Sequence, residues 1–120
     1  TILSLNDSII YYTKNIKENR FYPLIAYLNK GDFYYLKRNF NKSLDYYLIA
    51  NNYSDKNLPI KYDIKHKLSL LKTRYGDKIA GLKLSKEVLK YSLEKKHDVS
   101  QPNYYCQILF AIANAHLKNN

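Results

Sequence analysis

A short stretch of this 120-residue sequence occurs twice, beginning at residue 6 and again at residue 41. Residues 6–12 read Asn-Asp-Ser-Ile-Ile-Tyr-Tyr, and residues 41–47 read Asn-Lys-Ser-Leu-Asp-Tyr-Tyr. Further along, each copy is followed by an aromatic or apolar residue and a proline, at Pro23 and Pro59. Proline suits the first turn of a helix, where its missing N–H has no intrahelical partner. Self-similarity at an interval of this size is typical of proteins built from stacked helical units.

Apolar residues recur at helical spacing along most of the chain. In residues 60–75 they step by three or four positions, at Ile60, Ile64, Leu68, Leu71 and Tyr75. This spacing places them on one face of an α-helix and excludes a strand. Since helical spacing recurs along the chain and no strand pattern occurs, the sequence predicts an all-α fold. Short links make consecutive helices antiparallel neighbours. The six predicted helices cover residues 5–18, 23–37, 42–53, 60–75, 78–97 and 103–118.

Small residues hold two recurring places in these helices, where a small side chain lets two helix axes approach closely. They are the eighth and twentieth positions of repeats counted from Leu24, Tyr62 and Cys106. The eighth positions are Gly31, Ser69 and Ala113, and the twentieth positions are Ser43 and Gly81. Ser8 takes the twentieth place of an incomplete repeat before Leu24. Together with Tyr27, Tyr34, Phe40, Tyr47 and Ala50 in the first full copy, this pattern resembles the tetratricopeptide repeat. The copies start 38 and 44 residues apart, against about 34 in that family, and Lys30, Lys65 and Lys72 depart from its preferred residues.

The resemblance implies antiparallel helix pairs stacked as a right-handed superhelical array. It predicts one domain over residues 1–120, with helix pairs near 24–53 and 62–97 and half-repeats at 1–18 and 103–120, and we expect a fragment of a longer array. The amino-acid sequence of residues 26–44 and 70–77 is similar to that of repeat regions in bacterial, Bacteroidetes-type transcriptional regulators. That similarity implies the sensing or interaction region of such a regulator. It leaves the bacterial cytoplasm and the periplasm both open.

A repeat array of this kind exposes a concave face built from the first helix of each pair. The resemblance places seven candidate ligand-binding residues on it: Asp32, Tyr35, His66, Thr73, Arg74, Phe110 and Asn114. Aromatic side chains supply rigid contact area, while Asn and Arg can bond backbone or carboxylate groups. We therefore expect a protein or peptide partner, held as an extended segment or a helix. The alternative is that several of these residues pack against neighbouring repeats.

Positive charge is concentrated in the middle of the chain. Residues 56–96 hold twelve Lys or Arg and four Asp or Glu, a net +8 of the total +10. Such a segment could neutralise a phosphate backbone while tyrosines stack on bases, which makes a nucleic-acid-binding helical repeat the alternative function. Lys outnumbers Arg eleven to one there, however, and the lysines point around the helices. A solvated face is favoured, and we do not expect nucleic acid to be the partner of this segment.

Other functions find little support in the sequence. The three histidines, His66, His97 and His116, fall on different predicted helices, and Cys106 is the sole cysteine. No metal-ligand spacing, catalytic arrangement or cofactor motif is recognisable, so we expect neither an enzyme nor a cofactor. The longest uncharged stretch, residues 99–117, is interrupted by Pro102 and several polar residues, so no membrane insertion is expected. Self-association through the terminal half-repeats is a further expectation, because a second copy could cover apolar residues of the last helix.

Overall fold

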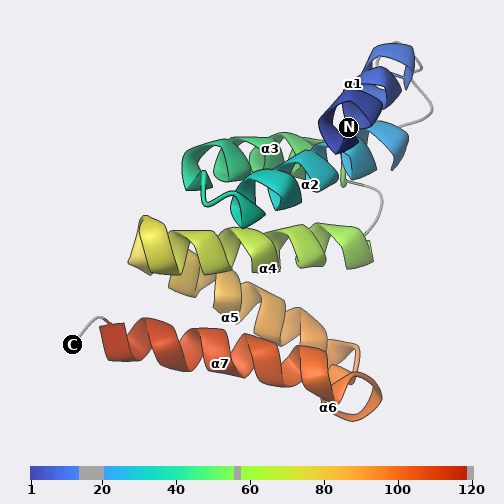
Figure 1. The fold of residues 1–120 in the computed structure, drawn as a ribbon. Helices are drawn as coiled ribbons and strands as arrows, with labels where there is room; N and C mark the ends of the chain where they lie inside the picture. The colour runs from blue at the N-terminus through green and yellow to red at the C-terminus, as the bar shows by residue number, and fades with distance from the viewer. Residues whose placement is uncertain (14–20, 56–57, 119–120) are drawn as a thin grey trace. The chain divides into compact units, whose positions relative to one another are not determined.

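A computed structural model describes residues 1–13, 21–55 and 58–118 (Figure 1). Over these residues the chain forms seven helices and no strand, which confirms the predicted all-α fold class. The helices are α1 (Ile2–Thr13), α2 (Phe21–Leu36), α3 (Phe40–Asn52), α4 (Leu58–Tyr75), α5 (Lys78–Glu94), α6 (His97–Ser100) and α7 (Pro102–Lys118). Prolines lie in the first turn of α2, α4 and α7, as their fixed φ favours.

The predicted helix boundaries need two corrections. The first helix begins at Ile2 and not at residue 5, because the Thr1 hydroxyl accepts a hydrogen bond from the Ser4 N–H at 3.1 Å; the predicted residues 14–18 lie outside the described ranges. The helix predicted to end at residue 97 ends at Glu94, because Lys96 takes a left-handed conformation with φ of 58°. Residues His97–Ser100 then form the separate short helix α6, which the sequence did not predict.

The chain divides into two compact units, residues 1–64 and 65–120, and the division falls within α4. In the first unit, α2 packs most extensively against α3, and α1 packs against α2. The Ser43 hydroxyl donates to the Gly31 carbonyl at 2.8 Å, and a Cβ at Gly31 would lie 2.4 Å from the Tyr47 ring. The close approach predicted at Gly31 and Ser43 is therefore confirmed. The core around it consists of Leu24, Ala26, Tyr47 and Ala50.

The second unit holds the α4 residues from 65 onward with α5, α6 and α7. A Cβ at Gly81 would lie 2.7 Å from the backbone nitrogen of Thr73, so α5 approaches the backbone of α4 closely at this glycine. Asp77 begins α5, because its carboxylate accepts hydrogen bonds from the N–H groups of Ile79 and Ala80, both at 3.1 Å. α7 packs against α5 and α6. The buried apolar residues of the unit are Leu68, Leu71, Val88, Tyr91, Ile108, Ala111 and Ala115.

Candidate functional site: a hollow between α4 and α7

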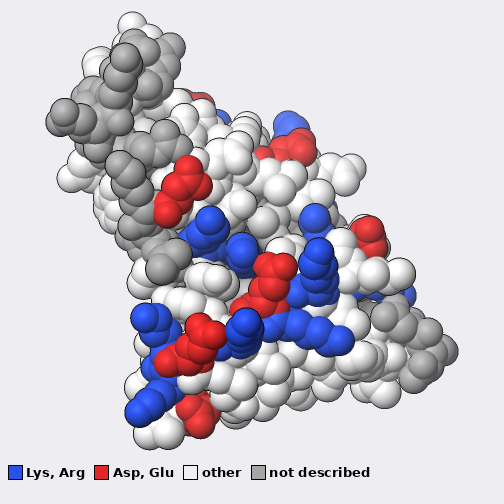
Figure 2. Space-filling view, turned by 180° about the vertical axis from the view of Figure 1, so that it is seen from behind, with Lys and Arg blue, Asp and Glu red and all other residues white. Residues whose placement is uncertain are grey.

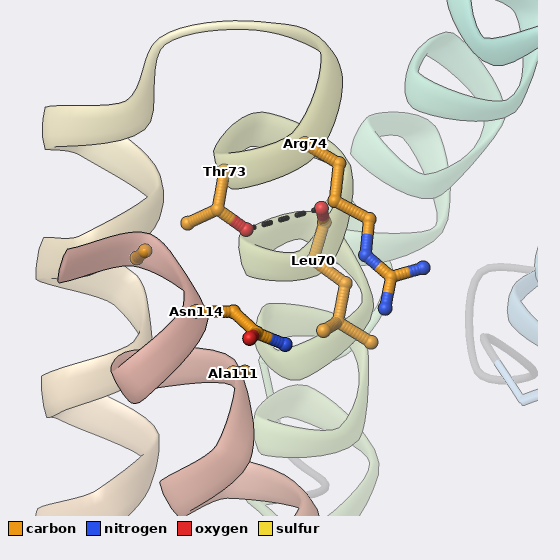
Figure 3. A pocket seen from close by; sticks show the side chains of 6 residues that line it. Leu70, Thr73, Arg74, Ala111 and Asn114 are labelled. Atoms are coloured by element: carbon orange, nitrogen blue, oxygen red, sulfur yellow. Dashed lines mark hydrogen bonds between the residues drawn. The ribbon is translucent and has the colours of Figure 1, made fainter. Parts of the chain in front are cut away.

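A shallow hollow lies between α4 and α7 in the second unit (Figure 3). Its volume is about 10 Å³, room for about one water-sized group, whereas pockets for small organic ligands usually measure about 300–1,000 Å³. The hollow is therefore a shallow depression that takes the tip of one side chain or a backbone group, and not a whole small molecule. It is lined by Leu70, Thr73 and Arg74 of α4 and by Ala111, Asn114 and Ala115 of α7.

Small and apolar residues form the floor of the hollow. Ala111 and Ala115 lie one turn apart on α7 and are both buried, and side chains of this size let α7 come close to α4. The Thr73 hydroxyl lies 2.8 Å from the Ser69 carbonyl oxygen and 3.2 Å from the Leu70 carbonyl oxygen; Figure 3 shows the latter contact. Because this hydroxyl is directed at the backbone of its own helix, Thr73 contributes mainly bulk to the wall.

The polar groups at the rim come from both helices. Arg74 is exposed and Asn114 is half-buried. In the view of Figure 3, the Arg74 guanidinium and the Asn114 amide lie on opposite sides of the Leu70 side chain. A guanidinium donates to carboxylate or carbonyl oxygens, while an amide both donates and accepts. The rim can therefore bond the polar groups of a chain that crosses the hollow.

His66 lies two turns before Thr73 on α4 and does not line the hollow. Its side chain is only 7% exposed, and its ring packs edge-to-face on Tyr104 of α7 at 5.6 Å. Among the described residues, no group hydrogen-bonds to its Nδ1. Burial lowers the pKa of His66, and the nearby charge of Lys67 lowers this pKa further. His66 is thus an uncharged packing residue near neutral pH.

The other predicted site residues do not line the hollow. Phe110, one turn before Asn114, is 71% exposed but is not part of the lining. Asp32 and Tyr35 belong to the first unit, where the Tyr47 hydroxyl donates to Asp32 at 2.5 Å and the Tyr35 ring contacts Phe40 at 5.7 Å. Burial raises the pKa of Tyr47, and the Asp32 carboxylate adds to the effect. Of the seven candidates, the structure brings Thr73, Arg74 and Asn114 together.

The sequence did not single out Ala111 and Ala115, which line the hollow, or Tyr104, which packs on His66. The spacing of the two alanines was a usable signal, since small residues four positions apart mark a helix face that another helix approaches closely. Tyr104 offered no such signal, because its role depends on His66 and on His97, whose ring lies 5.7 Å from it. These contacts join residues that are far apart in the sequence.

Tyrosines of the first unit form a stack that the sequence also did not predict. Tyr27 stacks on Tyr46 and Tyr53, and Tyr34 stacks on Tyr46, with ring centroids 5.5–6.3 Å apart. Lys30 lies 4.7 Å from the centre of the Tyr46 ring and forms an ion pair with Asp7 of α1. The stack and its lysine therefore join helices of the first unit, which is a packing role.

On the face that Figure 2 shows, positive charge is interspersed with negative charge. Figure 2 shows Lys and Arg side chains alternating with Asp and Glu over one face. Lys65 of α4, for example, pairs with Glu87 of α5 at 3.1 Å. A surface of mixed sign attracts a phosphate backbone less strongly than a continuous basic strip does.

The described residues contain no cluster of three or more His, Cys, Asp or Glu placed to hold a metal ion. None of the described helices is both long and apolar enough to span a membrane. Comparisons of the chain with protein-family models, curated proteins and solved structures found no match.

Proposed function

We propose that this chain is a peptide-binding scaffold of the tetratricopeptide type and serves as the sensing or interaction region of a bacterial transcriptional regulator. An extended segment of a partner protein would lie across α7 and α4, with the tip of one side chain in the hollow. The observation that carries this proposal is the combination of an apolar floor with the Arg74 guanidinium and the Asn114 amide at the rim.

The chemistry of the hollow favours an acidic or polar extended peptide. An amide such as that of Asn114 pairs with a peptide backbone, which offers both N–H and C=O groups. Arg74 pairs with a carboxylate, and the chain's net charge of +10 attracts acidic segments. The exposed Phe110 ring, one turn along α7, adds apolar contact area for the next side chain of the ligand.

A binding experiment with matched variants tests the proposal. A randomised decapeptide library selected on the immobilised chain supplies a labelled peptide, whose Kd is measured by fluorescence anisotropy. We expect Arg74→Gln to weaken binding about tenfold or more, since a hydrogen bond to a charged group contributes about 1.5–3 kcal/mol. Lys83→Gln is the control, because it removes the same unit of charge from an exposed position on α5 and should change Kd less than twofold.

Two results would count against this function. If both variants weaken binding equally, the peptide responds to net charge and not to the hollow. If the library yields no peptide that binds the wild-type chain, the proposal that the hollow binds peptides is wrong.

The alternative of nucleic-acid binding rests on the net +8 of residues 56–96. It predicts that labelled single-stranded DNA binds at low salt and dissociates steeply as salt rises. The mixed charges on the face in Figure 2 favour weak or no binding of single-stranded DNA, even at low salt. Binding that Lys83→Gln weakens as much as Arg74→Gln does would support the alternative.

A further inference from the structure

Two helices of the described chain, α1 and α7, each expose to solvent a face that carries no charged residue. On α1 this face consists of Leu5, Ser8 and Tyr12, of which Leu5 is 68% and Tyr12 75% exposed. On α7 it consists of Leu109, Ala113 and His116, with Leu109 41% exposed. Spacings of three and four residues put each set on one side of its helix. Neither face carries Asp, Glu, Lys or Arg, although these residues make up 25% of the sequence.

The contact between α2 and α3 shows how two such faces fit together. The Ser43 hydroxyl of α3 donates to the Gly31 carbonyl of α2 at 2.8 Å. One turn further along α3, the Tyr47 ring lies directly against Gly31. A small residue on one helix thus receives a serine and a tyrosine, four positions apart, from the other.

The exposed faces of α1 and α7 repeat the residues of this contact. Since residues 6–12 repeat residues 41–47, Ser8 corresponds to Ser43 and Tyr12 to Tyr47. Ala113 holds the place of Gly31 in the pattern of small residues. α1 is therefore equivalent to the second helix of a pair, and α7 to the first helix. Each copy of the chain carries both complementary halves.

We propose that α1 of a second copy of this chain docks on the exposed face of α7. Ser8 would lie against Ala113, and Tyr12 beside it, in the manner of Ser43 and Tyr47 against Gly31. The Ser8 hydroxyl, which donates to the Ser4 carbonyl at 3.0 Å, would turn to the Ala113 carbonyl. Because Ala113 has a methyl group where Gly31 has none, the tyrosine ring would sit further out, and the contact would be looser than that of α2 with α3.

The geometry of this contact sets its strength and stoichiometry. It joins two different surfaces, so each added copy leaves another α1 and another α7 exposed, and the association is open-ended. A single helix–helix contact buries less than the roughly 1,200 Å² of a stable interface. We therefore expect weak association, with Kd between about 10 µM and 1 mM.

Sedimentation velocity over the same concentration range tests the docking. The sedimentation coefficient of the wild-type chain should rise with concentration, and Ser8→Lys or Ala113→Lys should each abolish the rise. Both positions are exposed, so far-UV circular dichroism should be unchanged. The matched controls are Ile2→Lys and Gln107→Lys, exposed residues of the same helices about 120° around the axis, and these variants should associate like the wild type.

Mixing the Ser8→Lys and Ala113→Lys variants distinguishes this docking from a symmetric dimer. Ser8→Lys retains an intact α7 face, and Ala113→Lys retains an intact α1 face, so an equimolar mixture should form a 1:1 heterodimer and nothing larger. A mixture that stays monomeric overturns the proposal. So does a wild-type chain whose sedimentation is independent of concentration, or association that survives Ser8→Lys, since α7 would then pair with itself.

Discussion

At the scale of single residues, His66 is a buried titratable group whose pKa differs from its value in water. Its ring is buried against Tyr104, and among the described residues nothing bonds to its Nδ1. A protonated imidazole at this place would lose its hydration and face the charge of Lys67, which is why its pKa is lowered. The folded second unit therefore favours neutral His66.

This burial predicts a loss of stability in acid. In the unfolded chain His66 binds a proton near pH 6.5, while in the folded chain it does so only at lower pH. Below about pH 6.5 the unfolded state binds more protons, so the free energy of unfolding falls as pH decreases. Urea titrations between about pH 7.5 and pH 5 should show a steeper loss for the wild type than for His66→Leu. Since the carboxylates are common to both proteins, parallel profiles would contradict the account.

Lys30 shows what a sequence can and cannot indicate at this scale. Its position, where the repeat family prefers leucine, marked it as a departure. Its partner could not be predicted, because Asp7 lies 23 residues away on another helix and only tertiary packing brings the two together. Burial alone would lower the pKa of Lys30, but the Asp7 hydrogen bond and the other nearby groups outweigh burial and raise it.

At the scale of elements, Gly81 controls the approach of α5 to α4. A Cβ there would meet the Thr73 backbone nitrogen and side-chain methyl, both at 2.7 Å. A backbone atom within a helix cannot move aside as a flexible side chain can. Gly76, in the α4–α5 turn, would meet its nearest neighbour at 3.6 Å, an ordinary van der Waals distance.

The two glycines therefore predict opposite outcomes for the same substitution. Gly81→Ala should reduce the free energy of unfolding by about 2–3 kcal/mol through overpacking. Gly76→Ala should change it by no more than about 0.5 kcal/mol. Urea denaturation followed by circular dichroism measures both values, and equal stabilities of the two variants would show that α4 and α5 are not in close contact.

Local patterns predicted most of the elements, and their failures have local causes. Apolar periodicity located the major helices because burial of one face repeats every three or four residues. The end of α5 was predicted three residues too late because Lys96 adopts a left-handed conformation, which glycine or asparagine would have signalled. The recurring positions of small residues predicted the contact of Gly31 with Ser43, because only small side chains fit where two helices cross closely.

At the scale of the whole molecule, the candidate site was predicted only in part. The tetratricopeptide resemblance implied a concave face that included Thr73, Arg74 and Asn114, which line one hollow. It also included His66, whose burial depends on Tyr104 of another helix, and Asp32, which accepts a bond from Tyr47. Position in a repeat constrains which helix face a residue occupies. Whether that face is open depends on partners from other helices.

The most direct test of the peptide-binding account is a map of the bound peptide on the chain. We would record ¹H–¹⁵N NMR spectra of the labelled chain during titration with the peptide selected on it. The account predicts the largest shift changes at the amides of Thr73, Arg74, Ala111 and Asn114, together with the Asn114 side-chain amide. Changes confined to α1–α3 or to the lysines of α5, with those signals unmoved, would contradict it.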